Sequence, residues 1–102
     1  MIVDKLLPLI ERYDNINKEL VKPEILSDVK LLSKLTKEQS DLSSLVERAK
    51  EYLGVLKSIE DSRELLDDKE LGDLVKEEIK ILESKKIELE EEIKILLIPK
   101  DP

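Results

Sequence analysis

The sequence of 102 residues contains no cysteine, histidine, tryptophan or phenylalanine, and Tyr13 and Tyr52 are its only aromatic residues. Without cysteine there is no disulfide and no thiolate zinc site, and without histidine there is no Ser-His-Asp triad. Glycine occurs only at Gly54 and Gly72, so the sequence has no glycine-rich phosphate-binding loop. These absences lead us to expect no cofactor, no metal and no enzymatic activity in this chain by itself.

Long apolar runs and a targeting signal are lacking as well. The longest uninterrupted apolar run covers residues 95–98, far short of the roughly 20 residues that a bilayer-spanning helix needs. Asp4 follows almost at once after the start, which leaves no apolar core for a signal peptide. Acidic and basic residues are mixed, unlike in a basic membrane-surface helix. We therefore expect a cytoplasmic protein with no membrane contact.

Charged residues make up 42% of the sequence and hydrophobic residues 40%, a composition typical of coiled coils and long helices. Pro23 ends a first helix because its ring disfavours helical dihedrals at the preceding residue. Ser27 is the expected N-cap of the next helix. These features predict a helical bundle domain over residues 1–98, with helices at about 2–21, 27–66 (kinked near 40–44) and 71–97, followed by an exit linker at 99–102.

Apolar residues recur at alternating spacings of three and four, which places them on one face of each predicted helix. In the last helix this pattern forms a three-heptad, coiled-coil-like seam, and a second apolar stripe beside it indicates a second neighbour. We predict an all-α fold: a small antiparallel bundle of three to four long helices with a helical hairpin. The seam comprises Val75, Ile79, Leu82, Lys86, Leu89, Ile93 and Leu96, and the second stripe comprises Leu74, Ile81 and Ile95.

Three polar residues lie on the faces that pair in the predicted hairpin, and we call them the polar seam: Tyr52 and Arg63 in the middle helix and Lys86 in the last helix. Folding the chain about a short turn near Lys69 places Tyr52 opposite Lys86, whose aliphatic stem could cover the ring. We interpret these residues as structural polar positions that tune the register of the helices. The candidate acceptors for the Arg63 charge are Asp67, Asp73 and Glu77.

Two helix-breaking residues leave alternatives open. Gly54 lies inside a predicted helix, where glycine costs about 1 kcal/mol relative to alanine. Either another helix approaches closely there, or the position is exposed and the cost is tolerated. Pro8 lies in the first turns of its helix, which either starts or bends there.

The net charge of −7 is unevenly distributed. Residues 1–58 contain 10 acidic and 10 basic side chains, whereas residues 59–102 contain 15 acidic and 8 basic ones. The glutamates of the last helix are expected to be solvated rather than catalytic, because catalytic carboxylates need burial to shift their pKa. With the seam buried, the outward-facing acidic residues are Asp73, Glu77, Glu88 and Glu91. They form either a surface for a basic protein partner or a solubility device, and their charge argues against direct nucleic-acid binding.

Several stretches of the sequence resemble a known family. They are residues 1–6 with Glu11-Arg12-Tyr13, residues 22–28 (Lys-Pro-Glu-Ile-Leu-Ser-Asp) with 35–38 and 40–42, and residues 96–102 (Leu-Leu-Ile-Pro-Lys-Asp-Pro). In this order they are similar to the N-terminal helical domain of bacterial class I peptide chain release factors. The resemblance is collinear over the whole chain and is better to the branch that reads UAA and UAG.

The resemblance implies a role in translation termination. The family hydrolyses peptidyl-tRNA with a Gly-Gly-Gln loop and reads the stop codon with a separate Pro-containing tripeptide, and neither motif is present in this sequence. The chain is thus expected to be a fragment that acts as a protein-interaction and positioning module. Its implied partners are stalk-base proteins of the ribosome and the GTPase class II release factor.

A different class of function stays open at this point. A stand-alone coiled-coil adaptor or helical chaperone, oligomeric through its seam, would have the same composition and spacing. For a fragment, oligomers are instead expected as an artefact of truncation, because removing the rest of a factor exposes apolar surface.

Overall fold

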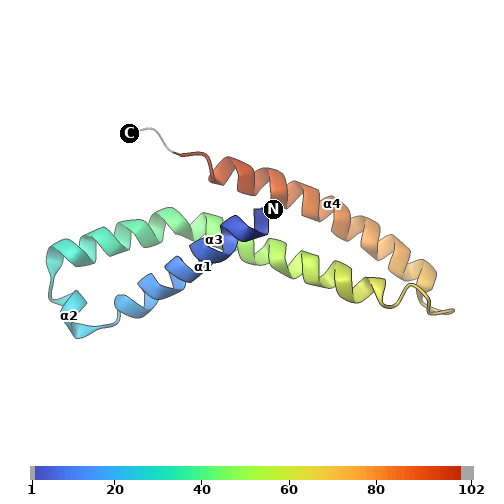
Figure 1. Ribbon diagram of the computed structural model, residues 1–102, viewed down its shortest axis with the longest axis horizontal. Coiled ribbons are helices and arrows are strands. Elements are labelled where there is room, and N and C mark those ends of the chain that lie inside the picture. Colours follow the sequence, from blue (N-terminus) through green and yellow to red (C-terminus); the bar gives the residue numbers. More distant parts are fainter. Residues whose placement is uncertain (1, 100–102) are drawn as a thin grey trace. The chain divides into compact units, whose positions relative to one another are not determined.

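The computed structural model describes residues 2–99, and these form helices and turns with no strand. The helices are α1 (Ile2–Glu19), α2 (Pro23–Leu26), α3 (Val29–Arg63) and α4 (Gly72–Leu96). The chain divides into two compact units, Met1–Glu47 and Arg48–Pro102, and the boundary falls inside α3 (Figure 1). The predicted all-α fold, with helix packed on helix, is confirmed.

The segment around Pro23 shows how the first helices end and begin. Lys22 has extended backbone angles, as expected before a proline, and Pro23 occupies the first turn of α2. Ser27 does not cap α3: its backbone is helical and its hydroxyl donates to the Glu24 carbonyl oxygen at 3.3 Å. Instead, Asp28 Oδ1 accepts the Leu31 amide at 3.1 Å. The predicted N-cap at Ser27 is wrong by one residue, because Ser27 is used to end the short helix before it.

The first unit packs α1 against the beginning of α3 (Figure 1). The Arg12 guanidinium donates two hydrogen bonds to the Glu38 carboxylate, at 2.8 and 2.6 Å. Gln39 Nε2 donates to Asn17 Oδ1 at 2.7 Å. The hydrogen bond from Arg12 holds the pKa of the Glu38 carboxyl below its usual value. A buried cluster of the unit comprises Ile16, Ile25 and Leu35, with Leu20, Leu31 and Leu42 packed against it.

The long helices α1 and α3 run without interruption through the residues at which the sequence suggests a break. α1 continues through Pro8, so the helix starts before this proline. α3 is one helix from Val29 to Arg63, and it continues through residues 40–44, where the sequence pattern predicts a kink. Polar side chains in this region are compatible with a helix surface; Thr36, for example, donates its hydroxyl hydrogen to the Leu32 carbonyl oxygen at 2.7 Å.

The second unit is an antiparallel hairpin made of the end of α3 and all of α4. Ion pairs join its helices: Lys85 Nζ lies 3.0 Å from Glu51 Oε1, and Arg48 Nη1 lies 4.0 Å from Glu92 Oε2. Between the helices the predicted seam is largely buried, although Leu96 at its end is 40% exposed. The buried residues of this unit are Ala49, Tyr52, Val55, Ile59, Val75, Leu89 and Ile93.

The second apolar stripe of α4 has no neighbour among residues 2–99. Leu74, Ile81 and Ile95 are 70%, 69% and 67% exposed. In the part of the chain that is described, α4 therefore buries only one of the two predicted faces.

The turn between α3 and α4 is held together by Asp68 and permitted by Gly72. Asp68 Oδ1 accepts the amides of Glu70 and Leu71 at 2.8 and 2.9 Å. A Cβ atom at Gly72 would lie 2.9 Å from the Leu66 carbonyl oxygen, so the close approach is at Gly72. Gly54 is exposed with open space around it, which decides between the two alternatives for that position.

After Leu96 the chain leaves the helix, and Leu97 still donates its amide to the Ile93 carbonyl oxygen at 2.9 Å. Of the predicted exit linker only Pro99 belongs to the described residues. Within residues 2–99 no helix is both long enough and apolar enough to cross a membrane.

Candidate protein-interaction surface

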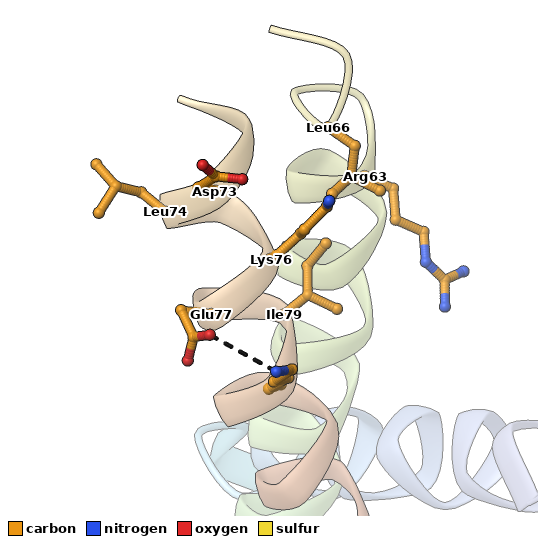
Figure 2. Close-up of a pocket in the computed structure, with 8 residues that line it drawn as sticks. Arg63, Leu66, Asp73, Leu74, Lys76, Glu77 and Ile79 are labelled. Carbon is orange, nitrogen blue, oxygen red and sulfur yellow. Dashed lines mark ion pairs between the residues drawn. The ribbon is translucent and has the colours of Figure 1, made fainter. Parts of the chain in front are cut away.

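An open groove of about 640 Å³ lies at the end of the α3–α4 hairpin. Its walls come from the last residue of α3, from the turn and from the first turns of α4, as Figure 2 shows. We call it the tip groove. It is lined by Arg63, Leu66, Asp73, Leu74, Lys76, Glu77, Ile79 and Lys80.

Two cations of the tip groove have carboxylate partners. Arg63 Nη2 donates to Glu83 Oε1 at 3.2 Å, and its side chain points away from the turn (Figure 2). Lys80 Nζ lies 3.6 Å from Glu77 Oε1, the ion pair drawn as a dashed line in Figure 2. Leu66 and Leu74 are 36% and 70% exposed. The groove therefore offers apolar contact surface with charged groups around it.

The acidic charge of the molecule is concentrated around this groove. Residues 60–78, which we call the acidic tip, contain 9 acidic and 3 basic side chains, a net charge of −6 out of the total of −7. All nine acidic residues are exposed. Seven of them form neither an ion pair nor a side-chain hydrogen bond within residues 2–99: Glu60, Asp61, Glu64, Asp67, Glu70, Asp73 and Glu78.

The structure divides the four predicted partner-facing carboxylates into two pairs. Asp73 and Glu77 line the tip groove, whereas Glu88 and Glu91 lie further along α4. All four are exposed. Glu91 Oε1 lies 3.8 Å from Lys94 Nζ, an arrangement that parallels the Glu77–Lys80 pair. That these residues contact a partner stays a prediction.

Two residues of the predicted polar seam, Tyr52 and Arg63, form hydrogen bonds that the sequence did not predict. Tyr52 is 3% exposed and donates its hydroxyl hydrogen to Glu90 Oε2 at 3.1 Å. Burial and then this hydrogen bond raise the Tyr52 pKa. Lys86 is half-buried. The predicted acceptors of the Arg63 charge, Asp67, Asp73 and Glu77, are wrong: the long side chain extends along the hairpin to Glu83 instead of toward the turn.

Sequence reasoning missed the groove itself. The sequence feature that could have indicated the groove is a cluster of four leucines within the acidic stretch. A turn that contacts only water needs no such group of apolar side chains. These leucines are Leu65, Leu66, Leu71 and Leu74, and all four are exposed.

The groove offers apolar and charged groups for binding. Among residues 2–99 there is no group of acidic side chains that could hold a metal ion. The described side chains also include no buried polar atom without a hydrogen-bond partner, which is the usual mark of an unfilled polar site. The arrangement is suited to contact with another macromolecule.

Comparison with known proteins finds one family of relatives. Residues 9–102 match the family model of the PCRF domain. The chain is 55% identical to peptide chain release factor 1 of a Nitratiruptor species, 56% identical to that of Aliarcobacter butzleri and 54% identical to that of Helicobacter hepaticus. Each alignment covers all 102 residues of the chain and 29% of the relative's length. No solved structure gives a significant match.

Proposed function

Because the chain belongs to the PCRF domain family, we propose that it is the N-terminal domain of a bacterial class I peptide chain release factor and serves there as a protein-interaction and positioning module. The observation that carries this proposal is the collinear identity of 54–56% over every residue of the chain. A stand-alone adaptor or chaperone is not favoured, because unrelated coiled coils share composition but not such an alignment.

In this proposal the whole factor acts in the cytoplasm, where it terminates translation at UAA and UAG and promotes peptidyl-tRNA hydrolysis. These 102 residues contain no Gly-Gly-Gln sequence. Hydrolysis and codon reading would therefore belong to the part of the relatives that the alignment does not cover. The chain alone would neither hydrolyse peptidyl-tRNA nor read a codon.

The proposed partners are stalk-base proteins of the ribosome and the class II release factor. Support comes from the acidic tip, since an arm with a net charge of −6 over residues 60–78 is repelled by phosphate and attracted to basic protein surfaces. Of the four predicted partner-facing carboxylates, we assign Asp73 and Glu77, which line the tip groove, to the surface that contacts the partner. Glu88 and Glu91 lie further along α4, outside the groove, and are not assigned to this contact. We assign Tyr52, Arg63 and Lys86 to the structure of the hairpin.

A chimera tests the proposal. The chain replaces the aligned 29% of the Nitratiruptor release factor 1, and peptide release is measured on ribosomes stalled at UAA, UAG or UGA. We expect release at UAA and UAG, none at UGA, and none with the 102-residue chain alone.

The control is the same factor with the aligned segment deleted. A helical, soluble chimera that releases no more peptide and binds ribosomes no better than this deletion variant would contradict the proposal. Release by the chain alone would contradict the assignment of hydrolysis to the remainder of the factor.

A further inference from the structure

We propose that the tip groove binds a basic amphipathic helix of a protein partner, with apolar side chains inserted into the groove and Lys or Arg side chains over the acidic tip. This inference deepens the proposed function, on which it rests for its biological setting. It names the chemistry that the partner must present and the end of the hairpin that receives it.

The shape and lining of the groove support an inserted apolar side chain. The volume of about 640 Å³ lies within the range of roughly 300–1,000 Å³ typical of ligand clefts. Leu66, Leu74 and Ile79 supply apolar contact surface, and Leu74 is 70% exposed in the absence of a partner. An amphipathic helix uses such a groove by inserting residues from one face, spaced three or four apart.

The negative charge around the groove favours a positively charged partner. Seven exposed carboxylates of the acidic tip have neither an ion pair nor a side-chain hydrogen bond among the described residues. Two of the nearby cations, Arg63 and Lys80, are already paired with Glu83 and Glu77. A cationic partner therefore gains complementary contacts here, and an acidic peptide, RNA or anionic membrane is repelled.

α4 carries a second set of similar residues that lies outside the tip groove, and these residues serve as a control. Glu91 pairs with Lys94 at 3.8 Å, as Glu77 pairs with Lys80 at 3.6 Å. Glu88 is exposed like Asp73. Ile95 is 67% exposed, against 70% for Leu74. The substituted residues are thus alike in type and exposure at the two ends of the helix, whereas the groove and the net charge of −6 around it are found at the first end.

The experiment titrates the labelled chain with a synthetic 15-residue peptide of leucine and lysine whose leucines lie on one helical face. Control peptides are a scrambled sequence of the same composition and an analogue with glutamate in place of lysine. Binding is followed by fluorescence anisotropy and by amide chemical shifts. We expect saturable binding of the amphipathic basic peptide, with the largest shifts in residues 63–80, and at least ~10-fold weaker binding of both controls.

Substitutions in the chain test whether the peptide binds in the tip groove. Asp73→Lys/Glu77→Lys and Leu74→Ser are each expected to raise the Kd on the order of tenfold. Glu88→Lys/Glu91→Lys and Ile95→Ser are expected to change it less than about twofold. Circular dichroism of all four variants checks that the helices are retained; these positions are exposed, so little loss is expected.

Several results would overturn the inference. If both charge reversals weaken binding equally, the peptide responds only to net charge. If Ile95→Ser raises the Kd as much as Leu74→Ser does, the peptide binds the exposed apolar stripe of α4 and not the groove. If sedimentation shows that the chain self-associates and Leu74→Ser abolishes this, the occupant is a second copy. The chimera assay is independent of these outcomes, because release at stop codons can succeed when peptide binding fails.

Discussion

Replacing the two glycines of the hairpin unit by alanine should change stability in opposite directions, because Gly54 faces open space and Gly72 faces backbone. Gly54→Ala should stabilise the protein by about 0.4–1 kcal/mol, since no atom outside the adjoining backbone of the same helix lies within 4 Å of the added Cβ. Gly72→Ala should destabilise it by about 1–3 kcal/mol, because the new Cβ would lie 2.9 Å from the Leu66 carbonyl oxygen. Urea unfolding of both variants measures the difference. Equal effects of the same sign would contradict the geometry of the turn.

Tyr52 is buried, and the contribution of its hydroxyl group to stability can be measured with a single substitution. Tyr52→Phe keeps the ring and removes the hydrogen bond to Glu90, which should lower the free energy of unfolding by about 1–2 kcal/mol. The raised pKa of Tyr52 favours the neutral phenol in the folded state. Its contribution is therefore present below the unfolded pKa of about 10 and is lost as the pH rises through the higher folded pKa.

The measurement is the free energy of unfolding of both proteins between neutral and alkaline pH. The wild-type chain should lose its advantage over Tyr52→Phe as the pH rises above about 10. An advantage that is independent of pH would show that the hydroxyl group acts only through packing.

In each unit, one glutamate forms an ion pair with the facing helix, and this pair should make the stability of the helix pair depend on pH in the acidic range. Arg12 lowers the pKa of Glu38 in the first unit, and Lys85 lowers that of Glu51 in the second. A lowered folded pKa stabilises the protein above the unfolded value of about 4.3, and this contribution is lost as the pH falls through the folded pKa. Glu38→Gln and Glu51→Gln should each reduce the loss of stability between pH 5 and pH 3.

Thermal unfolding followed by circular dichroism across this pH range measures the effect. The matched control is Glu64→Gln, which removes an exposed carboxylate with no ion pair within residues 2–99. If all three variants have the same pH dependence, the interhelical pairs do not contribute to acid stability.

Helix periodicity could be predicted from the sequence, whereas side-chain partners could not. The spacing of Leu89 and Ile93 places both residues on one face of α4, and this face is the buried one. The partner of Arg63 depends on the direction of a long, flexible side chain, and spacing does not determine this direction. The predicted N-cap is misplaced for a similar reason, since Ser27 and Asp28 are both good caps and the short α2 decides between them.

For the candidate site, too, the sequence predicts which residues face outward but not which residues come together. The sequence places the acidic surplus in residues 59–102, and the helical repeat correctly predicts that Asp73 and Glu77 face outward. The groove that they line needs Leu66 from the turn and Ile79 from α4 at one place. Such a juxtaposition depends on how the turn folds, through Asp68 and the close approach at Gly72.

For the whole molecule, the acidic charge is concentrated in one short part of the chain. Residues 1–58 are neutral, and a net −6 lies in the acidic tip at residues 60–78. An uneven charge distribution of this kind orients an encounter, because attraction to a basic surface acts mainly at one end. We therefore expect the acidic tip, and not the whole of α4, to dominate binding to the proposed partners.

The most direct test of this account is an equilibrium titration of the fluorescently labelled chain with bacterial ribosomes and, separately, with the class II release factor. The account predicts binding to at least one of them that is weakened on the order of tenfold by Asp73→Lys/Glu77→Lys and is nearly unchanged by Glu88→Lys/Glu91→Lys. Undetectable binding to both partners, or equal loss with the two double variants, would contradict it.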